Sequence, residues 1–128
     1  MFIGHFAVAF AAKRIAPRVS LGSAFFAAQL LDLLWPTLLL LGVERVQLAP
    51  AGAPVPLLFE HYPVSHSLVA AIGWGVLVAA LHFTWRRGAR GALVLAALVV
   101  SHWLLDLLVH LPDLPLSPGG AARLGLGL

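Results

Sequence analysis

Residues 91–111, with the sequence GALVLAALVVSHWLLDLLVHL, decide the fold, because they are apolar and long enough to cross a bilayer as a helix. The hydrocarbon core of a bilayer is about 30 Å thick and requires about 20 apolar residues in a helix. Residues 19–43 and 64–85 meet the same requirement. We therefore predict an all-α fold, a polytopic membrane helical bundle with three full spans.

A shorter apolar stretch at residues 2–12 precedes these spans. It gives only about 16 Å of helix at a rise of 1.5 Å per residue, so we expect a half-span or a strongly tilted helix. The Gly-rich end of the chain is expected to be loosely ordered. The predicted organisation is one membrane-embedded domain over residues 1–128, with helices at about 2–15, 19–43, 64–85 and 91–111 and a flexible tail at 114–128.

The composition supports a membrane protein, since 61% of the residues are hydrophobic and only 10% are charged. A soluble domain usually has about 25% charged residues, so this chain could not cover a surface that faces water. The absence of Cys excludes disulfides and thiolate chemistry. The net charge of +3 rests on only eight Lys and Arg residues. We therefore expect membrane lipids as partners, and no nucleic acid.

Six of the eight basic residues lie in two loops that the predicted topology places on one side of the membrane. They are Lys13, Arg14, Arg18, Arg86, Arg87 and Arg90. The positive-inside rule assigns these loops to the cytoplasm. All five acidic residues then fall in or beyond the outer half of the bilayer. The sequence therefore predicts that the polar chemistry lies on the outer side.

Ionisable residues within the apolar segments are the candidate functional groups, because each costs a few kcal/mol to insert into a bilayer. They are His5, Asp32, His66, His102, Asp106 and His110. The rise per residue places those of the three spans at similar depths in the outer half, whereas His5 needs helix tilt or a deeper loop to join them. His102, Asp106 and His110 are spaced four residues apart and share one helix face, which Asp113 extends.

A His and a carboxylate one helical turn apart can bind the same cation. A mixed His and Asp site suits zinc, manganese or iron(II), and zinc is the commonest choice for hydrolysis. Such a site leaves room for a water, as catalytic metal sites do. Ser65 and Ser67 are candidates to fix imidazole tautomers. Two alternatives remain: a Ser–His–Asp nucleophile, and polar side chains that serve only as hydrogen bonds between helices.

Four blocks of the sequence are similar to the motifs of one family. They are Gly4-His5, LDLLWP at 31–36, HYPVSHS at 61–67 and SHWLLD at 101–106. In these blocks and their order the chain resembles the predicted membrane-bound metal-dependent hydrolases, of the small LexA-regulated inner-membrane type found in bacteria. The family motifs are G-H, P-D-x-D-H-P, H-R-G-x-T-H-S and S-H-x-x-x-D.

The resemblance implies a metal site and a location in the bacterial cytoplasmic (inner) membrane. The implied metal ligands are His5, Asp32, His61, His66, His102 and Asp106. The chain departs from the family pattern at Leu34 and Trp35, which replace an acidic residue and a His of the second block. It also has Tyr62 and Pro63 in place of Arg and Gly in the third. His110 and Asp113 are candidate ligands that would compensate.

The predicted function is a membrane-embedded hydrolase that depends on a divalent metal ion, most simply zinc, and cleaves an ester or phosphoester. Asp32 and Asp106 are the candidate catalytic residues, and a lipid-linked substrate would reach the site laterally. One alternative is a transporter or relay protein for a metal ion or proton. Another is a small non-catalytic interaction subunit of the membrane. Because a bundle of three and a half helices is small, homo-oligomerisation would complete it.

Overall fold

The structure is a computed structural model that describes residues 2–53 and 57–128. Within this part of the chain, three helices are long and apolar enough to cross a membrane. They are α2 (Leu21–Leu40), α4 (Leu68–Arg86) and α5 (Ala89–Val109). The first helix, α1 (Phe2–Ile15), has 14 residues and is therefore only about 21 Å long. These elements confirm the predicted helical fold and fit a membrane protein.

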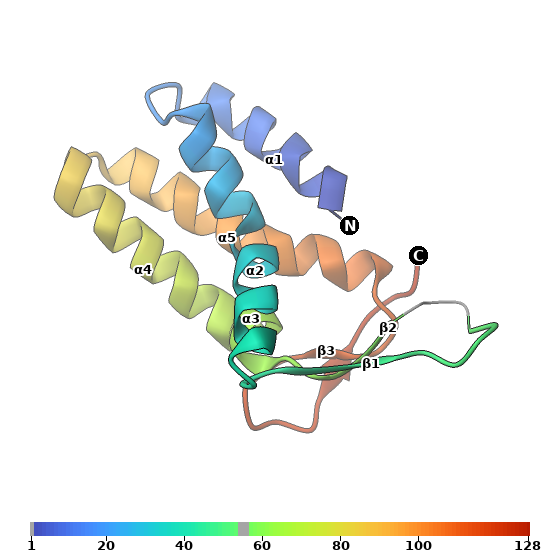
Figure 1. Cartoon of the computed structure of the whole chain (residues 1–128). Helices are drawn as coiled ribbons and strands as arrows, with labels where there is room; N and C mark the ends of the chain where they lie inside the picture. Colours follow the sequence, from blue (N-terminus) through green and yellow to red (C-terminus); the bar gives the residue numbers. More distant parts are fainter. Residues whose placement is uncertain (1, 54–56) are drawn as a thin grey trace.

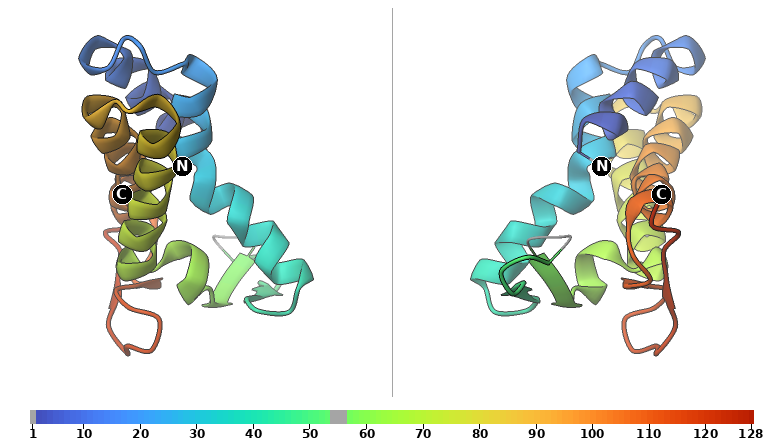
Figure 2. Two further views of the ribbon diagram at one scale, coloured as in Figure 1. Left: turned by 90° about the vertical axis from the view of Figure 1, so that its left-hand side faces the viewer. Right: turned by 90° about the vertical axis from the view of Figure 1, so that its right-hand side faces the viewer.

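Helix α5 is the central element of the fold. It packs along α4, and it also contacts α1 and α2, while α2 and α4 contact each other only slightly (Figure 1). Figure 2 shows that α2 leans away from α4 and α5 toward its C-terminal end. The short helix α3 (Pro63–His66) contacts both α2 and α4. Side chains on α5 can therefore meet side chains from α1, α2 and α3.

Two small antiparallel sheets correct the expectation of a purely helical chain. Strand β1 (Arg45–Leu48) pairs with β2 (Leu57–His61), and β3 (Leu114–Pro115) pairs with β4 (Arg123–Leu124). Helix α2 ends before β1 because Gly42 adopts a positive φ of 72°, a conformation that favours glycine and commonly ends helices. The first sheet therefore begins just after α2 and leads through β2 into α3.

The third predicted span is divided into two helices, which the sequence analysis did not anticipate. Ser67 has extended backbone angles, φ −79° and ψ 148°, and separates α3 from α4. Its hydroxyl caps α4 by accepting a hydrogen bond of 3.2 Å from the Ala70 N–H. Trp74 holds the two helices together, because its indole N–H donates to the Val64 carbonyl at 2.9 Å. His66 therefore ends a separate short helix.

The C-terminal part of the chain folds back on the helices, in contrast to the loosely ordered tail expected at 114–128. Leu114 is fully buried. The Val69 N–H donates to the Leu116 carbonyl, and the Leu126 N–H donates to the Leu107 carbonyl. These hydrogen bonds connect the segment to both α4 and α5.

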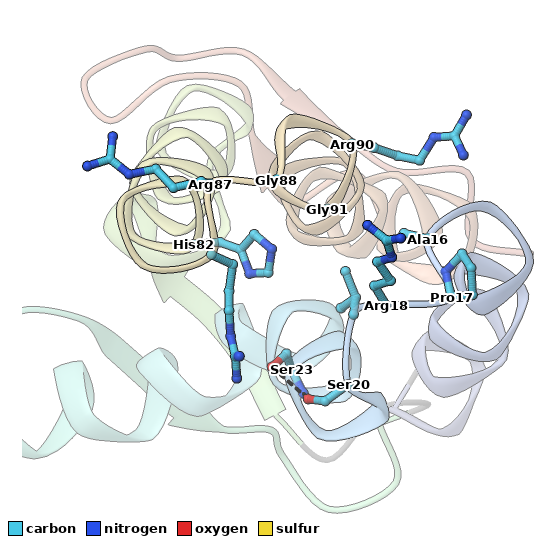
Figure 3. A pocket seen from close by; sticks show the side chains of 12 residues that line it. Ala16, Pro17, Arg18, Ser20, Ser23, His82, Arg87, Gly88, Arg90 and Gly91 are labelled. Carbon is cyan, nitrogen blue, oxygen red and sulfur yellow. Dashed lines mark hydrogen bonds between the residues drawn. The ribbon is translucent and has the colours of Figure 1, made fainter.

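A basic pocket of about 780 Å³ lies at the other end of the helices, between the α1–α2 turn and the α4–α5 turn. Its lining includes Arg18, Arg86, Arg87 and Arg90. Figure 3 shows His82 pointing inward between the helices, whereas Arg87 and Arg90 point outward. The two basic segments of the sequence therefore lie at the same end of the molecule.

Candidate metal centre

His102 of α5 is fully buried, and a backbone carbonyl fixes its ring. Its Nδ1 lies 2.7 Å from the Ala28 carbonyl oxygen of α2. Because a carbonyl can only accept, Nδ1 carries a proton, and in the neutral ring the lone pair is on Nε2. Nε2 lies 3.2 Å from Asp106 Oδ2 and 3.5 Å from Asp32 Oδ1, and it has no hydrogen bond among the described residues. This is the tautomer and environment of an imidazole that can bind a metal ion.

Asp106, one turn after His102, brings its carboxylate between imidazoles from separate helices. Its Oδ1 lies 3.3 Å from His5 Nε2 of α1. Its Oδ2 lies 3.8 Å from Nε2 of His66, at the end of α3. The Asp106 side chain is almost completely buried. Asp106 is therefore the common neighbour of three histidines.

Asp32 of α2 lies on the more open side of the cluster. Its Oδ1 lies 3.6 Å from His66 Nε2 and 3.5 Å from His102 Nε2. The Asp32 side chain is 27% exposed, whereas those of the four other cluster residues are 0–6% exposed. Water or a substrate would therefore approach the cluster past Asp32.

His5 reaches the cluster from the N-terminal end of helix α1. Its ring stacks on that of His102, with the ring centroids 3.7 Å apart and an angle of 9° between the planes. Both His5 ring nitrogens are buried without a hydrogen bond among the described residues. A neutral imidazole offers a nitrogen lone pair to a metal ion, so each of the stacked rings can contribute a ligand atom.

His66 is oriented by hydrogen bonds, as the sequence analysis predicted for Ser65. The Ser65 hydroxyl lies 2.8 Å from His66 Nδ1 and donates a hydrogen bond of 2.7 Å to Glu44 Oε2. Ser65 is completely buried and is therefore out of reach of a substrate as a nucleophile. This placement argues against Ser65 as a nucleophile and assigns it to the support of His66.

Glu44 is the residue that the sequence analysis missed. It lies between α2 and β1 and is 2% exposed. Its only signal in the sequence is an acidic side chain directly after an apolar span. Nothing in the spacing connects it with Ser65, because the contact depends on the β1–β2 hairpin, which returns the chain to the end of α2.

Two overlapping groups of side chains could each hold a metal ion. One contains His5, Asp32 and His102, and the other contains His66, His102 and Asp106. Within each group the ligand atoms all lie within 4.8 Å of one another. Ligand atoms about 2.0–2.1 Å from a tetrahedral zinc ion are about 3.3 Å apart, which is close to the measured separations. Two carboxylates among imidazoles also supply the negative charge that a buried divalent cation balances.

The structure does not bring His61 into this cluster. It is exposed at the end of β2, opposite Arg45 in the strand register. Side chains of consecutive strand residues point to opposite faces, and it is the next residue, Tyr62, that turns inward. The Tyr62 ring is buried with its centroid 5.5 Å from that of His66. Tyr62, and not His61, is therefore the neighbour of His66.

Three further candidates have other contacts. Ser67 caps α4, as described above. His110 lies beyond the last residue of α5, and its Nδ1 is 3.1 Å from Asp113 Oδ1. Both residues lie outside the two groups that could hold a metal ion. The helical stripe predicted from His102 through His110 ends because the chain leaves the helix after Val109, three residues before Pro112.

Comparison of the chain with protein-family models, curated proteins and solved structures gives no match. The resemblance to membrane-bound metal-dependent hydrolases therefore stays a prediction from four sequence blocks. The blocks contribute five residues that lie in one cluster, namely His5, Asp32, His66, His102 and Asp106.

Proposed function

We propose that this protein is a membrane-embedded, metal-dependent hydrolase of the family that its sequence resembles. The observation that carries the proposal is the convergence of three imidazoles and two carboxylates from α1, α2, α3 and α5 in an apolar interior. Ionisable groups inside a membrane protein are costly and commonly mark a functional site. A site of His and Asp, without Cys, fits a catalytic metal ion better than a closed structural one.

We propose zinc as the metal ion, with His66, His102 and Asp106 as its ligands. His5 and Asp32 adjoin this group and are available as further ligands. When bound, a divalent ion supplies Lewis acidity, which acidifies water and stabilises negative charge that develops on the substrate. The apolar surroundings strengthen these electrostatic effects, since they exclude bulk water.

Asp32 is the proposed general base, because it combines exposure with contacts to two imidazoles. Its carboxylate would take a proton from the attacking water as the new bond to carbon or phosphorus forms. The ester C–O or phosphoester P–O bond then breaks, and the proton passes to the departing alkoxide. Such proton transfer typically contributes about 10²- to 10⁴-fold to the rate.

The proposed substrate is a lipid-linked ester or phosphoester in the outer leaflet of the bacterial cytoplasmic (inner) membrane. The basic pocket marks the opposite end of the helices, and the positive-inside rule assigns that end to the cytoplasm. His102 lies 13 residues after the start of α5, or about 20 Å along the helix, which corresponds to the outer half of the bilayer. A lipid could approach Asp32 from the bilayer without leaving it.

The test is metal-dependent hydrolysis by the reconstituted protein. Liposomes that contain the protein and a panel of lipid esters and phosphoesters would first be depleted of metal with a chelator. Zinc would then be added, and the products would be measured by mass spectrometry. We expect hydrolysis that depends on added zinc and that Asp32→Asn lowers by at least about 100-fold. The matched control is Glu60→Gln, since Glu60 is an exposed carboxylate on β2.

Two results would contradict the proposal. One is a protein that binds zinc but hydrolyses no ester or phosphoester in the panel, at any zinc concentration. The other is equal loss of activity in the Asp32 and Glu60 variants. Zinc or proton flux across the same liposomes, without hydrolysis, would instead support the transport alternative.

A further inference from the structure

Glu44 accepts three hydrogen bonds from the short segment that carries His66. Its Oε1 accepts from the Val64 N–H at 2.9 Å and from the Ser65 N–H at 2.7 Å. Its Oε2 accepts from the Ser65 hydroxyl at 2.7 Å. Glu44 is 2% exposed and Ser65 is completely buried, so water does not compete for these contacts. The carboxylate therefore holds the start of α3 from outside the metal-binding groups.

The direction of these hydrogen bonds follows from the groups involved. Backbone N–H groups can only donate, so they favour the ionised, accepting form of the Glu44 carboxylate. The Ser65 hydroxyl has a single proton, which it donates to Glu44 Oε2. Its oxygen can then only accept from His66 Nδ1, 2.8 Å away. His66 must therefore carry a proton on Nδ1, and in the neutral ring the lone pair is on Nε2.

We propose that Glu44 is a positioning residue that fixes the tautomer of His66 through Ser65. His66 Nε2, freed in this way, is the atom that lies near Asp32 and Asp106. We call the chain of hydrogen bonds from Glu44 through Ser65 to His66 the relay. Its role in preparing His66 to bind a metal ion rests on the proposed function, whereas the assignment of the tautomer does not.

His102 supports the same principle by a different route. Its Nδ1 faces the Ala28 carbonyl at 2.7 Å, so its neutral ring also has the lone pair on Nε2. His66 and His102, the two imidazoles of the group that contains Asp106, therefore both have Nδ1 fixed by a hydrogen bond. The Ala28 carbonyl fixes His102, and Glu44 fixes His66 through the Ser65 hydroxyl. Partners of this kind are the usual supports of metal-binding histidines.

Glu44→Gln is the sharpest test, because it keeps the size of the side chain and reverses one hydrogen bond. The amide oxygen of Gln can still accept from the Val64 and Ser65 N–H groups. Its NH₂ group, however, donates to the Ser65 oxygen and turns the hydroxyl proton toward His66 Nδ1. The His66 proton is then expected on Nε2, which removes the lone pair that a metal ion needs.

The tautomer is measured directly by ¹⁵N NMR of histidine-labelled, metal-free protein in detergent micelles, with the signals assigned by omission in His66→Ala. We expect His66 to be protonated on Nδ1 in the parent and in the control Glu60→Gln, and on Nε2 in Glu44→Gln. Parent protein protonated on Nε2, or a tautomer unchanged by Glu44→Gln, would overturn the proposal.

Ser65→Ala is a second variant that keeps Glu44 and its backbone contacts but cuts the link to His66. We expect the single tautomer of His66 to become a mixture, and retention of the parental tautomer would contradict the relay. In zinc titrations of the same proteins, we expect Glu44→Gln to lower the affinity by about 10- to 100-fold. A relay that controls the tautomer in a parent that binds no zinc would refute the proposed function and leave the positioning role intact.

Discussion

At one end of the helices four exposed arginines line an open pocket, whereas toward the other end two aspartates and three histidines are packed against one another. His82 and His102 represent the two regions. His82 is half-buried in the basic pocket, and no described hydrogen bond fixes its ring. His102 is fully buried, with Nδ1 fixed by a carbonyl and Nε2 directed toward two carboxylates.

The difference shows what burial requires of an ionisable group. An exposed Arg keeps its charge in water or among lipid head groups and needs no fixed partner. A buried imidazole or carboxylate loses that solvation and must be compensated by hydrogen bonds or by opposite charge. The ordered partners of His66 and His102 therefore point to a site, whereas the arginines are explained by their place at one end of the molecule.

The largest effect that would sharpen this comparison is expected from Asp106→Asn. The amide removes the negative charge that three imidazoles share, while it preserves the shape of the side chain. Loss of a residue that only hydrogen-bonds a metal ligand typically lowers the affinity by about 10- to 100-fold. Because Asp106 is a proposed ligand itself, we expect the zinc affinity to fall by more than about 100-fold. Competition with a chromophoric chelator measures this affinity.

The matched control is Asp113→Asn, since Asp113 pairs with His110 outside both metal-binding groups. We expect its zinc affinity to equal that of the parent. Equal losses of zinc affinity in Asp106→Asn and Asp113→Asn would mean that the buried carboxylate has no special role in binding the metal ion.

Helix α4 packs along α5, the helix that carries His102 and Asp106. Gly75 tests this packing. A Cβ at Gly75 would lie 3.1 Å from the Ala96 carbonyl oxygen of α5, whereas a Cβ at Gly73 would have no neighbour within 4 Å. Gly75→Leu should lower the free energy of unfolding by about 1–3 kcal/mol through overpacking. Gly73→Leu gains the same helix propensity without the clash.

The measurement is unfolding of both variants in detergent micelles by a denaturant. Because the propensity term is common to both, the difference between them isolates the packing. A Gly73 variant as unstable as the Gly75 variant would show that the two helices do not meet as described.

Tyr62 tests whether the region around His66 is closed to water, and it is the only tyrosine of the chain. Burial raises the pKa of the Tyr62 phenol well above its ordinary value of about 10, and the Asp113 carboxylate raises this pKa further. A raised pKa contributes stability below the unfolded value and loses it as the pH rises above that value. We therefore expect stability to fall above about pH 10, and Tyr62→Phe to remove that fall.

Absorbance of tyrosinate near the red edge of the protein spectrum reports on Tyr62 alone. It should stay absent while the protein is folded and appear together with unfolding at high pH. Ionisation at about pH 10 in the folded protein would mean that the ring is open to water.

Depth along the helices predicted that candidate residues of α2 and α5 lie at the same level, although it also placed His110 there, which lies outside the cluster. Asp32, His102 and Asp106 lie on long apolar helices, where a constant rise per residue converts sequence position into depth. The same arithmetic placed His5 at a different depth unless α1 tilted or a loop lay deeper, and the structure brings His5 to within 3.3 Å of Asp106. The helical part of the fold and most of the candidate cluster could therefore be predicted.

The contributions of the connecting segments could not be predicted in this way. Glu44 meets Ser65 only because a β-hairpin returns the chain, and the pairing of β1 with β2 has no helical period. The exposure of His61 follows from its position at the end of β2. In each case a local turn or strand, rather than the period of a helix, decides which side chain faces the cluster.

The smallest effect is expected for His110→Ala. His110 is partly exposed and its only described polar side-chain partner is Asp113, so the loss should cost no more than about 1 kcal/mol of stability. Zinc content should not change, because the ring lies outside the metal-binding groups. A drop in zinc content would contradict this expectation. It would show that His110 is a ligand and that the site extends beyond α5.

The most direct test of the central claim is the metal content of protein purified in mild detergent without a chelator, measured by mass spectrometry. The parent and His82→Ala should each contain close to stoichiometric zinc or another transition metal, and folded His102→Ala should have lost it. A parent that is free of metal and takes up no added zinc would contradict the account. The buried histidines and aspartates would then serve to pack the helices or to relay protons.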